Sequence, residues 1–395
     1  MSNTINKADQ YFMNTGKREP IVLVRGEGAK VWDEDGKEYL DFVCGWAVNN
    51  LGHCPPNVVR AIKEQAQTLI QTSNHYYTIP QTELAELLIE NSAMDELFLC
   101  NSGAEANEGA AKLARRYGKI HKNGAYEIIS LSGSFHGRTM AMISASGQQK
   151  YQEPYSPLPT GYINVEFNNI EAVKAATNEK TCAIILEPVQ GEGGINVPSQ
   201  EYMRALREWC NQNNLLLIFD EVQTGIGRCG ALFAYELFAI VPDIITLAKG
   251  LGSGLPIGAF MAQKKACVFK QGEHGSTFGG NPLCCAAAIA NLKYILNNNI
   301  PFHAKEMGEY ITNALLTLKD EHSIVDCVRG KGLLLGLVLK EEISEKLCRQ
   351  AEYNGLLVNN VQKAVIRLMP PLIITKEDAN QAVKILDQSL KELGY

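Results

Sequence analysis

Two short apolar runs in the middle of the chain limit the folds available to it. Leu215 to Phe219 ends at Asp220, and Ile244 to Ala248 ends at Lys249. Short apolar runs bounded by polar residues and glycine are typical of strands buried on both faces of a parallel sheet. Because functional groups in such sheets lie beyond the carboxyl ends of the strands, we expect Asp220 and Lys249 to meet at one edge.

A lysine and a carboxylate at one sheet edge suit the chemistry of pyridoxal phosphate. The lysine amine forms an imine with the aldehyde of this cofactor, and the carboxylate keeps the pyridine nitrogen protonated, so that the ring withdraws electrons. Asp220 and Lys249 are therefore the candidate catalytic residues.

The pattern of the whole chain predicts an α/β protein with two domains. Apolar runs alternate with helical patterns from about residue 96 to 260, which predicts a large domain around a mostly parallel sheet. The tail alternates helical patterns with strand-like runs, as expected of a smaller α+β domain. We expect a large domain over residues 51–299, a small domain over 300–395, and an N-terminal segment, 1–50, that packs with the small domain.

The motif Asn101-Ser-Gly-Ala-Glu-Ala-Asn107 has the features of a helix start. Ser102 is a good N-cap, and Glu105 follows at the spacing of a capping box. Gly118 follows an alanine-rich run with two arginines, so the helix is predicted to end at Tyr117.

The same helix start is a candidate phosphate site. The first N–H groups of a helix lack internal partners and carry the positive end of its dipole, so the amides of Gly103 and Ala104 favour an anion. The alternative is an ordinary capped surface helix, since capping boxes are common.

Two further loops follow predicted strands. Phe135, His136 and Arg138 come after the run Ile128 to Leu131, where an aromatic ring could stack on a cofactor and an arginine could grip a carboxylate. Another buried run, residues 182–189, contains Glu187 and leads into a glycine-rich loop.

Composition excludes several classes of protein. A formal net charge of −6, a pI near 5.8 and the lack of a basic run argue against nucleic-acid binding. No segment approaches the roughly 20 apolar residues that span a bilayer. The 11 cysteines are scattered, as in a reducing compartment, and the first residues carry no apolar stretch of the signal-peptide type. We expect a cytoplasmic protein.

Three alternatives use the same residues differently. Gly225 to Gly230 matches G-x-G-x-x-G, the pattern of an NAD-dependent dehydrogenase, but it begins well after the strand that ends at Asp220. A metal site is not expected, because the 7 histidines show no H-x-x-H spacing and read as loop or packing residues. An inert regulatory relative is expected to lack Asp220 or Lys249, and both are present.

Several motifs, in this order, resemble one enzyme family over essentially the whole chain: NSGAEAN, SFHGRT, EPVQGEGG, FDEVQTGIGR, TLAKGLG, GSTFGGNPL and RLMPPL. They resemble the class III, fold-type I pyridoxal-phosphate aminotransferases. AVNNLGH, KGLGSGLPIGA and HGSTFGGNP are most similar to the acetylornithine aminotransferase branch. That resemblance implies transfer of the side-chain amine of N2-acetyl-L-ornithine to 2-oxoglutarate, which gives N-acetyl-L-glutamate 5-semialdehyde and L-glutamate in arginine biosynthesis.

The resemblance also implies roles for residues around pyridoxal 5′-phosphate. Lys249 would hold the cofactor and then move the proton between substrate and cofactor. Asp220 would pair with the pyridine nitrogen, Val222 and Phe135 would sandwich the ring, and Gln223 would bond its phenolic oxygen.

By the same resemblance, two subunits share each site. Ser102, Gly103 and Ala104 would hold the phosphate together with Thr277 of a neighbouring subunit. A homodimer is therefore implied.

Substrate roles follow from the resemblance as well. Arg138 would bind the carboxylate of acetylornithine, Ser276 would help to bind substrate, and Glu192 would neutralise Arg367 until 2-oxoglutarate arrives. An ordinary structural ion pair is the alternative for the last two. Trp46 lies where relatives that act on free ornithine carry a tyrosine, and one N–H donor serves a free α-ammonium poorly. This favours an N-acylated donor and leaves open succinylornithine and N-succinyl-diaminopimelate; ornithine and 4-aminobutyrate are the alternative donors of the class.

Overall fold

A computed structural model describes residues 2–395, and its largest sheet has seven strands in the order β4-β10-β9-β8-β7-β5-β6. Neighbouring strands from β9 to β6 run parallel, whereas β10 is antiparallel to both β4 and β9. The predicted mostly parallel sheet is confirmed, with one reversed strand. The strands are β4 (Glu96–Cys100), β5 (Glu127–Leu131), β6 (Tyr162–Val165), β7 (Thr181–Leu186), β8 (Leu216–Asp220), β9 (Ile244–Leu247) and β10 (Gly258–Ala262).

The central strands are apolar throughout because both faces of the sheet are covered. In β8, Leu217 and Phe219 belong to one hydrophobic cluster, which includes Leu206 of α9, while Leu216 and Ile218 belong to a second cluster formed with α5. Alternate side chains thus point to opposite buried faces. The helices of this part are α3 (Pro56–Thr68), α4 (Ile79–Glu90), α5 (Gly103–His121), α6 (Met140–Ala145), α7 (Gln149–Gln152), α8 (Ile170–Ala176), α9 (Gln200–Gln212) and α10 (Pro282–Asn297). Short 3₁₀ turns are η1 (Ser73–His75), η2 (Glu153–Tyr155), η3 (Ala234–Phe238), η4 (Lys249–Leu251) and η5 (Lys264–Ala266).

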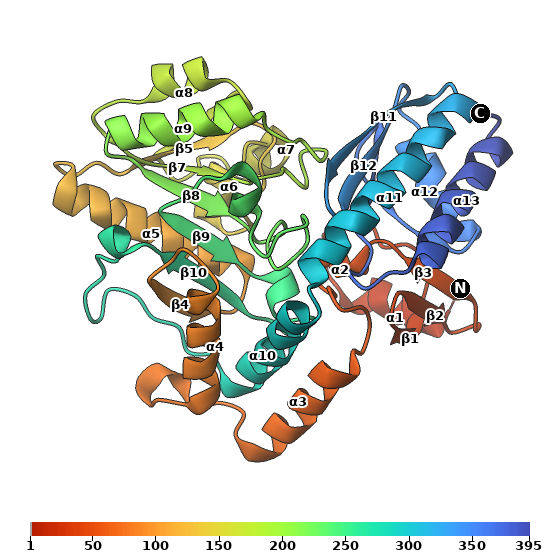
Figure 1. Ribbon diagram of the computed structural model, residues 1–395, viewed down its shortest axis with the longest axis horizontal. Helices are drawn as coiled ribbons and strands as arrows, with labels where there is room; N and C mark the ends of the chain where they lie inside the picture. Colours follow the sequence, from red (N-terminus) through yellow and green to blue (C-terminus); the bar gives the residue numbers. More distant parts are fainter. Residues whose placement is uncertain (1) are drawn as a thin grey trace.

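The chain also forms two four-stranded sheets, and one of them brings the two ends of the chain together. One has the order β11-β12-β15-β14, and the other has the order β1-β2-β3-β13, in which Leu356 of β13 pairs in parallel with Leu40 of β3. Figure 1 shows the red N-terminal strands beside the blue C-terminal elements. The strands are β1 (Leu23–Glu27), β2 (Lys30–Asp33), β3 (Glu38–Asp41), β11 (Val325–Lys331), β12 (Leu334–Leu339), β13 (Leu356–Leu357), β14 (Asn359–Gln362) and β15 (Val365–Leu368). The helices are α1 (Asn3–Tyr11), α2 (Cys44–Ala47), α11 (Ile300–Glu321), α12 (Ser344–Tyr353) and α13 (Lys376–Glu392).

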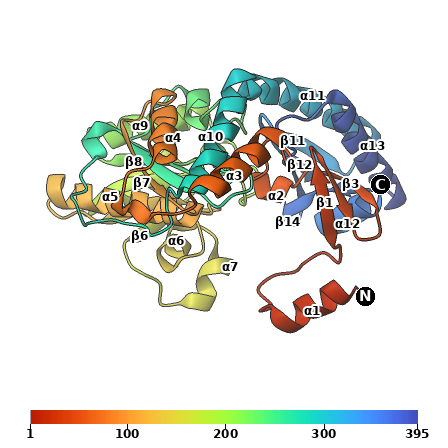
Figure 2. The same ribbon diagram turned by 90° about the horizontal axis from the view of Figure 1, so that it is seen from below.

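The first helix, α1, stands apart from the rest of the chain (Figure 2). None of its residues is buried, and the apolar side chains at its end are exposed: Tyr11 to 75%, Phe12 to 63% and Met13 to 86%. Among residues 2–395, no helix combines the length and the apolar character needed to cross a membrane.

The predicted end of helix α5 was wrong. The helix continues past Tyr117 to His121, so Gly118 lies inside it. A Cβ at position 118 would collide with the carbonyl oxygen of Ala125 and lie 2.8 Å from Cβ of Cys182. The glycine therefore permits close packing against a neighbouring segment and does not end the helix.

The predicted capping box was only half right. Ser102 Oγ accepts from the Glu105 N–H at 3.2 Å, as expected of an N-cap. The Glu105 carboxylate instead accepts from the N–H of Asn101 at 2.5 Å. Because that bond goes to the residue before the cap, it ties the end of β4 to the start of α5.

Candidate active site

A cavity of about 460 Å³ lies at the carboxyl ends of β5, β7, β8 and β9, beside the N-terminus of α5. This is the edge at which functional groups of a parallel sheet gather. Asp220 and Lys249 both line it, as predicted. The other predicted site residues in the lining are Ser102, Gly103, Ala104, Phe135, Arg138, Glu192, Val222 and Gln223.

Asp220, the last residue of β8, is only 3% exposed and is held by several donors. Its Oδ2 accepts from Asn107 Nδ2 at 2.7 Å and from His136 Nδ1 at 2.8 Å. Its Oδ1 accepts from the N–H of Val222 at 3.0 Å. The Thr246 hydroxyl donates to Asn107 Oδ1 at 2.7 Å, which turns the amide N–H₂ of Asn107 toward the carboxylate. A buried anion is stable only with such partners.

These supporting residues were not predicted. Asn107 and His136 lie within the motifs NSGAEAN and SFHGRT, and Thr246 is the one hydroxyl residue in the apolar run of β9. A polar residue inside an otherwise apolar strand was the signal available for Thr246. The sequence offered none for the contact of His136 with Asp220, because 84 positions separate them.

Lys249 lies two residues beyond Leu247, the last residue of β9, and has a left-handed backbone with φ of 41°. Residues with a side chain adopt this conformation rarely. Burial in the cavity wall lowers the pKa of the Lys249 amine, although the Glu192 carboxylate acts in the opposite direction. A lower pKa favours the neutral amine, which is the nucleophilic form.

Glu192 forms an ion pair with Arg367 of β15. Arg367 Nη1 lies 2.5 Å from Glu192 Oε1 and 3.4 Å from Gln223 Oε1. Burial alone would raise the pKa of Glu192, but the Arg367 guanidinium outweighs this effect and lowers it. Among residues 2–395, Arg367 Nη2 is buried without a hydrogen-bond partner. The guanidinium thus keeps one unused donor next to the cavity wall.

Glu187 is a second carboxyl group in the cavity wall. It follows the end of β7, is 6% exposed, and its Oε2 has no hydrogen-bond partner within the part of the chain that the structure describes. Burial and then the neighbouring charge of Asp220 raise the pKa of Glu187 well above its ordinary value. This shift favours the protonated form of the carboxyl group.

Three predicted residues other than Arg367 also lie outside the cavity lining. Ser276 Oγ accepts from Asn101 Nδ2 at 3.2 Å, so it sits just behind a lining residue. Thr277 is exposed. Trp46 is 60% exposed and has a φ of 62°, two positions before the lining residue Val48.

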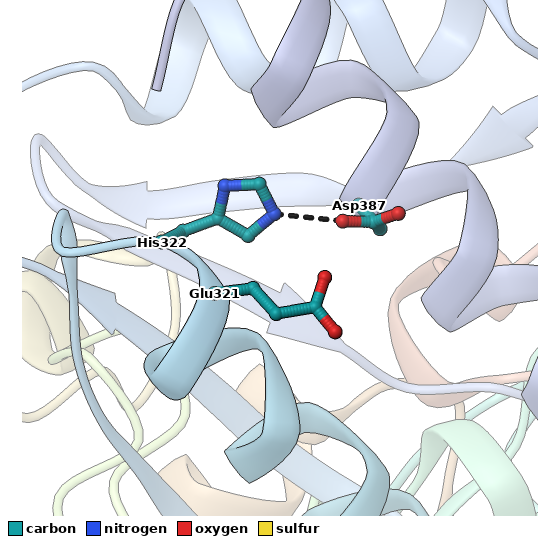
Figure 3. A group of neighbouring side chains, drawn as sticks. All are labelled: Glu321, His322 and Asp387. Carbon is teal, nitrogen blue, oxygen red and sulfur yellow. Dashed lines mark hydrogen bonds and ion pairs between the residues drawn. The ribbon is translucent and has the colours of Figure 1, made fainter.

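One group of residues between 2 and 395 has the ligand types and spacing of a metal site (Figure 3). It consists of Glu321, His322 and Asp387, but its atoms already have partners. His322 Nε2 bonds Asp387 Oδ1 at 2.7 Å, and its Nδ1 bonds the main-chain oxygen of Tyr395 at 2.9 Å. Lys391 Nζ lies 2.7 Å from Asp387 and 3.7 Å from Glu321. The ammonium therefore supplies the positive charge that these carboxylates need.

Comparison with known proteins decides the family, because residues 11–390 match the family model for aminotransferase class-III. The chain belongs to the class III aminotransferases. It is 50% identical to an acetylornithine aminotransferase of Caldanaerobacter subterraneus subsp. tengcongensis over 98% of both chains.

Solved structures agree with the family. A Toxoplasma gondii ornithine aminotransferase, described with partial occupancy of PLP at its active site, matches with a TM-score of 0.95 and 32% identity over 98% of this chain and 93% of that one. An acetylornithine aminotransferase of Elizabethkingia anophelis matches with a TM-score of 0.88 and 33% identity over 98% of each chain. The dehydrogenase alternative is therefore excluded.

As a class III aminotransferase, the protein uses pyridoxal 5′-phosphate, and the cavity fits this cofactor. A Cβ at Gly103 would lie 2.7 Å from Val222 Cγ1, so glycine lets the Val222 side chain pack against the start of α5. His136 Nε2 and Gln223 Nε2 are buried and have no partner among residues 2–395. The lining thus offers a helix N-terminus for a phosphate, unused polar atoms, a carboxylate and an amine.

Proposed function

We propose that the protein transfers the side-chain amine of N2-acetyl-L-ornithine to 2-oxoglutarate, as a step of arginine biosynthesis. The observation that carries this proposal is the 50% identity with an acetylornithine aminotransferase over nearly the whole chain. The cavity supports it, because its lining includes Arg138, which has no ion-pair partner among residues 2–395, and Glu192, which neutralises Arg367 behind the lining.

We assign the cofactor roles from the positions of the side chains. Bound pyridoxal phosphate supplies an electron sink for the carbon that loses its proton. Lys249, whose amine pKa is lowered by burial, would hold the cofactor and then carry the proton. Asp220, which accepts hydrogen bonds from Asn107 and His136, would pair with the pyridine nitrogen. Phe135 and Val222 enclose the ring.

We assign the phenolic oxygen to Gln223, whose Nε2 has no hydrogen-bond partner among residues 2–395. The phosphate is assigned to Ser102, Gly103 and Ala104 at the start of α5, since its first amides have no helical partners.

Two substrates share the site: N-acetylornithine has one carboxylate and 2-oxoglutarate has two. We assign the carboxylate of acetylornithine to Arg138, which lines the cavity. With acetylornithine bound, Glu192 keeps Arg367 neutralised. The second carboxylate of 2-oxoglutarate would displace Glu192 and use the donors of Arg367, whose Nη2 has no partner within the part of the chain that the structure describes.

We propose that Trp46 favours a donor whose α-amine is acylated. Trp46 offers one N–H donor and no acceptor, so it serves an acylated amine better than the α-ammonium of ornithine. N-succinyl donors, including N-succinyl-diaminopimelate, share this property. Ornithine and 4-aminobutyrate are the competing substrates of the class.

We also propose a cytoplasmic homodimer with shared active sites. Large apolar side chains that a monomer would leave in water support an interface: Tyr11, Phe12, Met13, Tyr77 and Phe278, each more than half exposed. Thr277 is exposed next to Phe278 and is assigned to the partner's phosphate site. The free thiols support a reducing compartment.

The chain is proposed to divide into a large domain (51–299), a small domain (300–395) and an N-terminal segment (1–50). Pairing of β13 with β3 supports the packing of this segment with the small domain.

The decisive experiment follows the visible absorbance of the purified protein with pyridoxal phosphate bound. Adding N-acetylornithine without an oxo acid is expected to convert the yellow cofactor to its amine form, and 2-oxoglutarate is expected to restore it. Ornithine, N-succinylornithine and 4-aminobutyrate serve as competing donors. No change with N-acetylornithine, together with a change with one of the others, would replace the proposed donor by that compound.

A further inference from the structure

Arg138 presents its guanidinium to the cavity without a polar partner. It is exposed and lines the cavity, and the hydrogen bonds and ion pairs of residues 2–395 do not include its guanidinium. Its central carbon instead lies 4.0 Å from the ring centroid of Tyr151 and 5.4 Å from that of Phe135. Aromatic rings, and no carboxylate, therefore hold this cation.

Stacking on an aromatic ring leaves the donors of an arginine available. A guanidinium is attracted to the face of a ring by the ring quadrupole, and its N–H groups point outward in the plane of the group. A carboxylate partner, in contrast, would occupy those N–H groups. Contact with Tyr151 thus orients Arg138 and leaves its fork of donors for a substrate carboxylate.

The position of Tyr151 is itself fixed by its surroundings. Tyr151 belongs to the short helix α7, and its ring meets that of Phe135 nearly edge-on, at 5.7 Å between centroids and 74° between planes. The next residue, Gln152, donates to the carbonyl oxygen of Ser146 at 2.7 Å. This bond anchors α7 to the segment that follows α6.

Tyr151 contacts its neighbours through its ring and not through its hydroxyl group. The hydroxyl group makes no hydrogen bond within residues 2–395, whereas the ring also lies 4.9 Å from Lys150 Nζ. Two cations lie beside this ring, and one of them, Arg138, lines the cavity, which suits an anionic substrate.

We propose that Tyr151 is a positioning residue for the amino donor: its ring holds Arg138 so that the free edge of the guanidinium receives the donor's carboxylate. This inference rests on the proposed function, in which Arg138 binds the carboxylate of N-acetylornithine. It adds a specificity determinant that does not itself touch the reacting atoms.

The test compares Tyr151→Leu with Tyr151→Phe, which keeps the ring. Three probes separate the contributions. N-acetylornithine carries both the amine and the carboxylate; N-acetyl-1,4-diaminobutane carries the amine but lacks the carboxylate; N-acetyl-L-norvaline carries the carboxylate but cannot react. Steady-state kinetics is measured with the first two, and calorimetric binding to the cofactor-loaded enzyme is measured with the third.

We expect Tyr151→Leu to raise the KM for N-acetylornithine and the Kd for N-acetyl-L-norvaline about two- to fivefold, the usual contribution of a partly exposed cation–π contact. The kcat and the kinetics with N-acetyl-1,4-diaminobutane are expected to stay within about twofold of the wild-type values. Tyr151→Phe is expected to match the wild type in every assay.

Three results would overturn the inference: an unchanged KM and Kd in Tyr151→Leu, an equal loss in Tyr151→Phe, or an equal loss with the carboxylate-free donor. Failure of the proposed function is distinct, because the wild-type enzyme would then not use N-acetylornithine at all. The melting temperatures of both variants show whether a loss comes from unfolding.

Discussion

Arg367 Nη1 lies 2.5 Å from Glu192 Oε1, and the two side chains differ in exposure: that of Arg367 is 0% exposed and that of Glu192 is 27% exposed. The buried cation is thus fixed in β15, while the carboxylate reaches it from the wall of the cavity. A partner on the accessible side can be displaced without moving the buried one. This difference in exposure suits a site that binds a substrate with one carboxylate in one half-reaction and a substrate with two carboxylates in the other.

Glu192→Ala is expected to relax the selectivity for the amino donor. Without its neutralising carboxylate, Arg367 attracts the α-carboxylate of glutamate, which N-acetylornithine lacks beside its reacting amine, during the first half-reaction. We expect the ratio of kcat/KM for N-acetylornithine over glutamate to fall by about tenfold or more, since a charge-assisted hydrogen bond contributes about 1.5–3 kcal/mol. Stopped-flow half-reactions with each donor measure this ratio. Glu208→Ala, on the exposed side of α9, is the control, and an unchanged ratio in Glu192→Ala would leave the pair a structural one.

Asn107→Ala is expected to weaken both the fold and the binding of the cofactor. The change removes donors to Asp220 Oδ2 and to the carbonyl oxygen of His136, at 2.7 and 2.8 Å. The carbonyl oxygen of His136 loses its donor, at a cost of about 1–3 kcal/mol, whereas Asp220 Oδ2 keeps only His136 Nδ1. Urea unfolding of the cofactor-free protein and titration with pyridoxal phosphate measure the two losses. Thr246→Val leaves the bond from Asn107 to Asp220 in place and is expected to lose less stability and less cofactor affinity. If Asn107→Ala were as stable as the wild type, the hydrogen bonds of Asn107 would not stabilise the fold.

Glu221 is expected to make stability depend on pH. Burial raises the pKa of Glu221 to about 8 from the ordinary value of 4.5, although it accepts from the N–H groups of Ala234 and Tyr235. Between these values the folded protein keeps a proton that the unfolded chain releases. The free energy of unfolding therefore falls as pH rises through this range, by about 1.4 kcal/mol per pH unit from this group, and the fall ends near pH 8.

Glu221→Gln is expected to remove that contribution. Urea unfolding at several pH values between 5.5 and 7.5 compares the slopes, and the variant is expected to release about one proton fewer on unfolding. Parallel slopes for the variant and the wild type would mean that Glu221 is ionised in the folded protein.

Arg228→Met is expected to destabilise the protein by about 2–4 kcal/mol, because it leaves several buried acceptors without a donor. Arg228 is fully buried and donates to the carbonyl oxygens of Leu333 and Pro370, at 3.1 and 2.5 Å, and to Asn50 Oδ1 at 3.0 Å. These bonds join segments that are far apart in the chain. Thermal unfolding measures the loss, and Arg349→Met, at an exposed position, is the control. A variant as stable as the control would contradict this role.

Local sequence patterns predicted the individual strands well where burial alone decides them. The runs that end at Asp220 and Lys249 are apolar because β8 and β9 are covered on both faces, and this pattern does not depend on distant residues. Strand β11 was not predicted, since only Val325 at its start is fully buried and the remaining residues show no clear alternation.

Predictions from sequence patterns failed for residues whose role depends on a contact with a distant segment of the chain. Gly118 resembles a helix end, but it is needed because Ala125 packs against it. His136 resembles an ordinary loop residue, yet it bonds Asp220 of another strand. In both cases the partner is supplied by the tertiary fold.

The sequence by itself determined the family, the α/β architecture and the pairing of a lysine with a carboxylate at one sheet edge. Periodic burial and parallel strand direction follow from local composition, and the motifs identify the chemistry. Only the tertiary structure decided which side chains surround Asp220 and Lys249 and hold them in place. The bonds to Asp220, the stacking of Tyr151 on Arg138, and the access of Glu192 to Arg367 depend on distances between separate segments. Hydrogen bonds and cation–π contacts act over a few ångströms, so they form only after those segments have packed together.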